Sequence, residues 1–348
     1  MENQQGSNGI WEQEQPKDFV LTKKEIEGCR HKSEKRWYRG LCVLNVMIIL
    51  CFIGCIVAFL PEKSKEMKQE FSEMAEEMQE TWNEVQDETE GKEEAEKEAE
   101  KTKDKKESKE NSKQDEDGLT SEEKDTILMY SVGALLLLIM FPLALNLYYQ
   151  QYRTMSIRIT PKNFPDIYER VELYAKRLGM KKVPEVYVIQ QDGILNAFSS
   201  FIIRKQYIEI YADIFEVAYR EHKDLDAISF VIAHEMAHIK YKHATFGYNI
   251  KILFARMIPI LGSTASRARE YSCDRLAQKV TGNDGIDAMF SLMAGKHLYK
   301  MVDKEDYLEY AKTVKGFFVW VANLLADHPV MTKRIQALEK GEGSGKLY

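Results

Sequence analysis

Two long runs without a charged residue dominate the hydrophobic pattern of this chain. The first covers residues 41–60, which are 20 uncharged positions in succession, and the second covers about residues 126–149. A helix needs about 20 mainly apolar residues to cross a bilayer. Both runs are therefore predicted to be transmembrane helices, the second with a kink at Pro142.

Shorter patterns follow the second run. A helical period ends at Gly179, β-rich stretches alternate with polar residues, and the rest of the chain is mainly helical in pattern. The predicted elements are a helix over 165–178, strands over 186–190, 195–203 and 207–211, a helix over 224–242 and further helices to 338. We therefore expect an α+β fold, mainly helical with a small sheet and preceded by two transmembrane helices.

The stretch between the two apolar runs is strongly acidic. Residues 61–126 hold 12 lysines against 25 aspartates and glutamates, a net charge of −13, although the whole chain carries only −6. Apolar side chains recur every three or four positions over 67–85, which predicts an amphipathic helix that self-associates as a coiled coil or lies on a membrane. Residues 91–117 have almost no large apolar side chains and are not expected to fold. No residue cluster suggests nucleic acid binding.

Basic residues flank the apolar runs on their outer sides. Arg36 and Arg39 precede the first run, and Arg153 and Arg158 follow the second. The positive-inside rule then places both termini and everything after the second run in the cytoplasm. The predicted divisions are a cytoplasmic segment 1–40, a span 41–60, an acidic extracytoplasmic loop 61–125, a span 126–149 and a catalytic domain 150–348. The five cysteines indicate no disulfide framework.

The chemistry is concentrated in the predicted helix over 224–242. His234, Glu235 and His238 have the spacing His-Glu-x-x-His, which puts both imidazoles on one helix face. Two such imidazoles can hold one Zn²⁺, and the glutamate beside the first can take a proton from water. The pattern predicts one zinc ion per catalytic domain, with Glu235 as the catalytic base.

A catalytic zinc site needs a third protein ligand and an open position. Glu270 and Asp274, again four residues apart, lie on one face of a later helix. Glu270 is the natural third ligand, and Asp274 could accept a hydrogen bond from a ligand histidine and orient it. The alternative is a solvated charged face. His243 falls one residue short of the third histidine of metzincins, so it is expected on the surface or behind the ligands.

Four motifs in this order resemble one family. In chain order they are the Asn-Ala-Phe segment at 196–198, His234-Glu235-x-x-His238, Glu270-x-x-x-Asp274, and His328-Pro329 followed by Arg334. This set resembles the membrane metallopeptidases that group HtpX with the CAAX prenyl endopeptidases. The resemblance covers about residues 155–340 and implies a zincin-type domain in which Asn196 binds the substrate main chain.

The same resemblance implies that His328 could stabilise the oxyanion; a structural turn is the alternative for this residue. The chain departs from HtpX-like proteins in one respect, because it has no further transmembrane hairpin between the two zinc motifs. Residues 244–262 contain Lys251 and Arg256, and charges of that kind are costly at a membrane centre. We expect an amphipathic helix there that covers the cleft or touches the membrane surface.

These features predict a zinc-dependent endopeptidase held in the membrane, acting on proteins or peptides and, by resemblance, removing damaged membrane proteins. Two alternatives remain open. One is a membrane-tethered sensor or scaffold whose metal domain only binds, although a purely structural zinc site has no use for Glu235. The other is a processing peptidase for one specific peptide.

Overall fold

The computed structural model describes residues 19–55, 121–190, 197–202, 205–220, 222–343 and 345–348. The chain divides into two units, Met1–Ile48 with Ile139–Tyr348, and Ile49–Leu138. The predicted amphipathic helix over 67–85 and Asn196 fall outside the described residues. Every other candidate residue belongs to the first unit.

The first unit contains a small sheet of four strands. Its order is β1-β2-β4-β3, and the strands are β1 (Ile157–Arg158), β2 (Glu185–Ile189), β3 (Ala197–Ile202) and β4 (Lys205–Tyr211). β2 and β4 are parallel, and β3 pairs with β4 antiparallel, Ala197 facing Ile210. Among the described strands, β3 therefore lies at the edge of the sheet.

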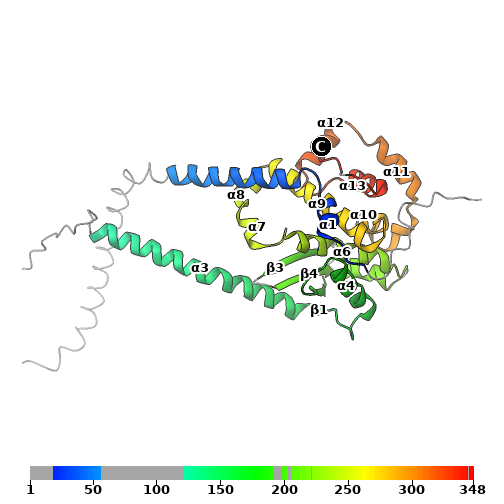
Figure 1. The fold of residues 1–348 in the computed structure, drawn as a ribbon, viewed down its shortest axis with the longest axis horizontal. Coiled ribbons are helices and arrows are strands. Elements are labelled where there is room, and N and C mark those ends of the chain that lie inside the picture. The colour runs from blue at the N-terminus through cyan, green and yellow to red at the C-terminus, as the bar shows by residue number, and fades with distance from the viewer. Residues whose placement is uncertain (1–18, 56–120, 191–196, 203–204, 221, 344) are drawn as a thin grey trace, which may run out of the picture. The chain divides into compact units, whose positions relative to one another are not determined.

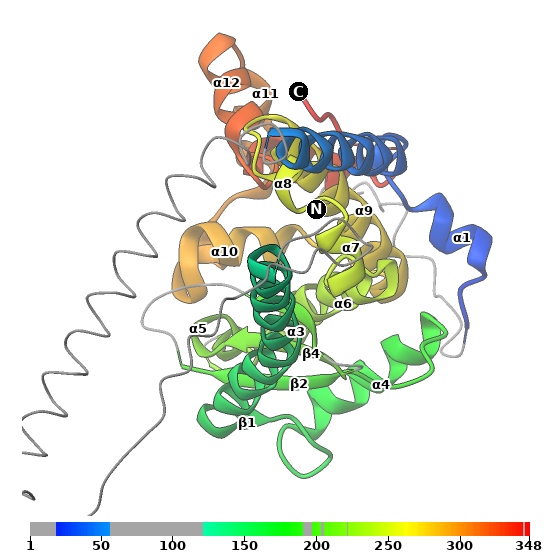
Figure 2. The same ribbon diagram turned by 90° about the vertical axis from the view of Figure 1, so that its left-hand side faces the viewer.

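Two helices form the centre of the unit, α6 (Leu225–Tyr241) and α9 (Leu261–Thr281). Asp224 caps α6, because its side chain accepts from the backbone N–H of Asp226 and of Ala227. Apolar side chains bury α6 on nearly all sides, as expected for a central helix. Figures 1 and 2 show the strands on one side of α6 and α11 to α13 on the other.

Shorter helices surround this centre. They are α4 (Pro165–Arg177), α5 (Ala212–Phe215), α7 (Phe246–Ile250), α8 (Leu253–Arg256), α10 (Ile286–Leu298), α11 (Lys304–Thr313), α12 (Phe317–Leu325) and α13 (Met331–Lys340). The predicted helices over 165–178 and 224–242 are confirmed to within a residue or two, and the fold is mostly helical as expected.

The segment that precedes the first apolar helix is part of the same core. α1 (Lys23–Gly28) begins with a capping box formed by Thr22 and Glu25, and Ile26 is buried in the main hydrophobic cluster. The hydroxyl of Tyr241, at the end of α6, donates to the carbonyl of Ile26 at 2.7 Å. Residues 19–48 thus belong to one compact unit with the helices that carry the candidate site.

Two helices are long and apolar enough to cross a membrane. One is Glu34–Cys55, and the other is the part Leu128–Met155 of α3 (Ser121–Met155). Their apolar side chains are largely exposed, for example Leu50, Phe52 and Leu137. A core helix of a soluble protein would bury such residues, so both helices indicate association with a membrane.

The prediction of one amphipathic helix over 244–262 is wrong. The chain forms α7 and α8 instead, with a break at Ile252 and a positive φ of 71° at Ile260. Asn45 of the first apolar helix accepts from the N–H of Phe254 at 2.8 Å and of Ala255 at 3.3 Å. These tertiary bonds replace helical ones, and α8 lies beside the middle of that helix (Figure 1).

Candidate active site

α6 and α9 pack against each other and bring three side chains to one point. His234 Nε2 lies 3.2 Å from His238 Nε2, and each of these nitrogens lies 3.3 Å from an oxygen of Glu270. Ligand atoms bound tetrahedrally at about 2.0–2.1 Å from Zn²⁺ lie about 3.3–3.4 Å apart. The three side chains therefore have the chemistry and spacing of a zinc site with its fourth position open.

His234 is held from behind by a carboxylate. Its Nδ1 lies 2.9 Å from Asp274 Oδ1, so the Nδ1 proton goes to Asp274 and Nε2 is left free for a metal. Arg334 of α13 donates from Nε and Nη2 to the two oxygens of Asp274, at 2.6 and 2.7 Å. This bidentate pair fixes the carboxylate and joins α13 to the site.

Electrostatics bias this site toward binding a cation. Burial would raise the pKa of Glu270, but hydrogen bonds from His234 and His238 hold it well below its ordinary value. Burial opposes charge on His234 as well, yet its bonds to Asp274 and Glu270 outweigh that cost and raise its pKa to about 9. A proton must therefore leave His234 when a metal binds, and metal affinity should rise with pH.

The three side chains open onto a cleft of about 280 Å³. Glu235 lies in this cleft next to the candidate ligands, and Ala197 and Ser199 of the edge strand β3 form another wall. His328, between α12 and α13, is 67% exposed, and its Nε2 is 3.8 Å from Glu270. The lining residues are Ala197, Ser199, His234, Glu235, His238, His243, Ala244, Asn249, Arg256, Arg269, Glu270 and His328.

The structure thus gathers six of the seven residues singled out from the sequence, while Asn196 falls outside the described residues. Sequence reasoning assigned no role to Arg334, because nothing in its helical spacing connects α13 with Asp274. It also left His243 undecided between the surface and a position behind the ligands, and the structure buries it at 3% exposure beside His238.

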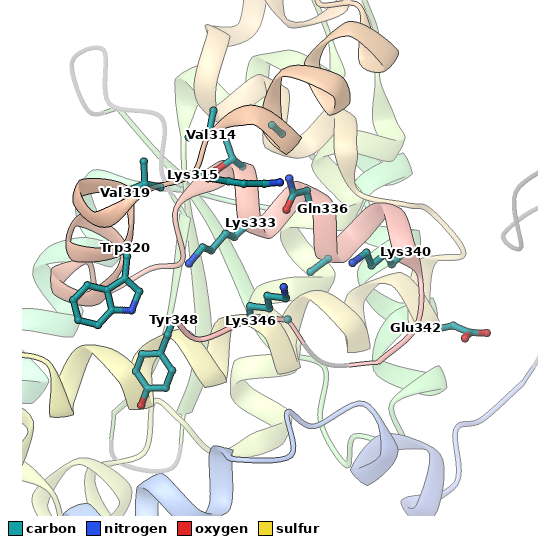
Figure 3. A pocket seen from close by; sticks show the side chains of 15 residues that line it. Val314, Lys315, Val319, Trp320, Lys333, Gln336, Lys340, Glu342, Lys346 and Tyr348 are labelled. Atoms are coloured by element: carbon teal, nitrogen blue, oxygen red, sulfur yellow. The ribbon is translucent and has the colours of Figure 1, made fainter.

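A second hollow, of about 360 Å³, lies between α12, α13 and the C-terminal residues (Figure 3). Lys315, Lys333, Lys340 and Lys346 surround it together with Trp320. No histidine or cysteine lines this hollow. Among the described residues, two overlapping groups could hold a metal ion: His234, His238 and Glu270, or His238, His243 and Cys273.

A candidate metal site on two packed helices, with a glutamate beside it and a strand along it, is the arrangement that a metallopeptidase requires. The family model of Peptidase family M48 matches residues 161–255 and 245–342, which together make up more than half of the chain. The protein belongs to Peptidase family M48, a zinc-dependent family. No curated protein and no solved structure matched the chain.

Proposed function

We propose that this protein is a membrane-anchored, zinc-dependent endopeptidase with a zincin-type site. One observation carries the proposal: His234, His238 and Glu270 meet at tetrahedral spacing in the cleft that also holds Glu235. A purely structural zinc site would have four protein ligands and no adjacent base. Here three side chains would hold the ion, and all three line the cleft that a substrate can enter.

The residues of the chain have separate tasks in this proposal. When bound, Zn²⁺ supplies Lewis acidity that polarises a carbonyl and makes water acidic enough to react at neutral pH. Glu235 takes the proton of the attacking water and delivers it to the leaving amine. His328 donates a hydrogen bond to the oxyanion of the tetrahedral intermediate, and its exposed position lets it adjust to the substrate.

The edge strand supports cleavage within a chain rather than at its ends. β3 is the last strand of the described sheet on one side, and its residues Ala197 and Ser199 line the cleft. An extended substrate can add itself to such an edge through main-chain hydrogen bonds. This mode of binding needs no free terminus, and it tolerates many side chains, as the removal of damaged membrane proteins would require.

The direct test uses the full chain, purified in detergent, and a peptide blocked at both ends. We expect cleavage of this peptide, loss of cleavage after chelation, and recovery when one equivalent of Zn²⁺ is added. Cleavage of unblocked peptides alone would show an exopeptidase. A rate that survives removal of all bound metal would exclude metal-dependent hydrolysis altogether.

The proposed cellular role is quality control of membrane proteins, and its test compares cells with the wild-type protein and with Glu235→Gln. Misassembled membrane proteins should accumulate in the variant cells. Accumulation of a single precursor peptide would instead identify a processing peptidase. An unchanged membrane proteome would remove the quality-control role.

We also propose that the catalytic domain faces the cytoplasm, because basic residues flank the two apolar helices on their outer sides. Protease added to intact cells from which the cell wall has been removed should then cut within residues 61–126 and spare residues 151–348. Tags at the two ends of the chain report which part survives. Cleavage of the catalytic domain with the acidic segment protected would reverse this topology.

A further inference from the structure

A carboxylate from outside the matched family region reaches the site. Glu34 is the first residue of the apolar helix Glu34–Cys55 and is only 3% exposed. Its carboxylate accepts hydrogen bonds from Arg30, from the hydroxyl of Ser272 on α9, and from His243 Nε2 at 3.1 Å. A charge this deeply buried is stable only because these three partners satisfy it.

His243 is placed by the end of α6. Lys242 adopts a left-handed conformation with a φ of 66°, and the N–H of His243 donates to the carbonyl of His238 at 3.0 Å. This cap turns the chain back on the helix. The ring of His243 consequently lies against the ring of His238, with its Nδ1 3.1 Å from His238 Nδ1.

The protons on these rings follow from the partners. A carboxylate only accepts, so Nε2 of His243 must carry a proton and donate it to Glu34. A neutral imidazole carries one proton, so with Nε2–H given to Glu34 the Nδ1 of His243 is an acceptor. Two groups face that nitrogen, His238 Nδ1 at 3.1 Å and the thiol of Cys273 at 3.7 Å. The shorter contact assigns the donor as His238 Nδ1–H, and the other ring nitrogen of His238, Nε2, faces Glu270 at 3.3 Å.

We propose that Glu34 is a positioning residue for the zinc site, acting through His243 to fix the tautomer and orientation of His238. The inference rests on the proposed zinc function. Asp274 orients His234 by a direct hydrogen bond, and Glu34 would orient His238 in the same way, but through the imidazole of His243. Because Glu34 begins the first apolar helix, it also makes the geometry of a zinc ligand depend on how that helix is seated.

The experiment measures zinc affinity by competition with a chelator for the full chain in detergent, comparing wild type, Glu34→Gln, His243→Phe and the double variant. Partners of this kind change metal affinity by about 10–100-fold. We expect a loss in that range for each single variant, and no further loss in the double variant, because both interrupt the same chain of bonds. The Co²⁺-substituted protein should show shifted d–d bands in each.

Tyr241→Phe is the matched control. It removes the bond from Tyr241 to the carbonyl of Ile26 and so loosens the same N-terminal segment. The phenylalanine ring keeps the contacts of Tyr241 with His243 and Arg30. We expect a lower thermal midpoint with zinc affinity unchanged. Equal weakening of zinc binding in this control would reduce Glu34 to a general anchor of the segment and overturn the proposal.

Wild-type zinc affinity and an unshifted Co²⁺ spectrum in Glu34→Gln would overturn it as well. His234→Ala, measured in parallel, separates this failure from a failure of the proposed function. If His234→Ala loses zinc while Glu34→Gln keeps it, only the positioning role is wrong. If both keep it, the metal is bound elsewhere and both proposals fall.

Discussion

Replacing Glu235 by glutamine is expected to leave zinc in place and to slow peptide hydrolysis by about 10²–10⁴-fold, the usual contribution of a general base. Glutamine has nearly the size of glutamate but cannot take a proton from water. Glu235 does not belong to the group His234, His238 and Glu270 that could hold the ion. The affinity for zinc should therefore be unchanged. The measurements are kcat/KM with a blocked fluorogenic peptide and zinc content by elemental analysis.

Glu339→Gln is the control for this change. It makes the same substitution at an exposed position of α13, away from the cleft, and should hydrolyse peptide at the wild-type rate. If Glu235→Gln also kept that rate with a full complement of zinc, the proton would be carried by another group and the assignment of the base would be wrong.

Replacing Glu270 by glutamine is expected to remove most of the zinc after dialysis, with affinity weaker by at least about 100-fold. Outer partners of metal ligands already change affinity by about 10–100-fold, and a direct ligand should matter more. The neutral amide loses the negative charge that faces His234 and His238 at 3.3 Å. Zinc stoichiometry and chelator competition both report the loss.

Glu235→Gln serves as the control here, because it removes one negative charge from the same cleft without removing a ligand. A general electrostatic effect would weaken zinc binding in both variants alike, whereas ligation predicts a large loss in Glu270→Gln alone. Full zinc stoichiometry in Glu270→Gln would show that the third ligand is another residue.

Features set by neighbouring positions could be predicted from the sequence. Asp224 as the cap of α6 depends only on the next three residues, and the shared face of His234 and His238 follows from the turn of a helix. The apolar helices follow from length and composition in the same way. The meeting of Glu270 with the two histidines needed one additional premise, that a catalytic metal has a third ligand.

Contacts between distant parts of the chain could not be predicted in this way. The segment around Glu34 has an ordinary polar pattern, and nothing in it shows that the carboxylate will be buried against His243. The ion pair of Arg334 with Asp274 could not be predicted either, because nothing in the sequence around Arg334 indicates that it meets Asp274. In residues 244–262 the pattern indicated one helix, but the backbone N–H groups of Phe254 and Ala255 donate to Asn45 instead of continuing it.

The docking of the N-terminal segment has a consequence for how the protein is made. Ile26 bonds to Tyr241, which lies 215 positions later in the chain, and His31 bonds to Ser272, which lies 241 positions later. At about 5–20 residues per second, a ribosome needs about ten to fifty seconds to synthesise the chain between such partners. Both apolar helices are translated within that interval. The catalytic unit can therefore be completed only after they have left the ribosome, and a fragment starting near residue 150 would lack Glu34 and expose the surface that covers Ile26.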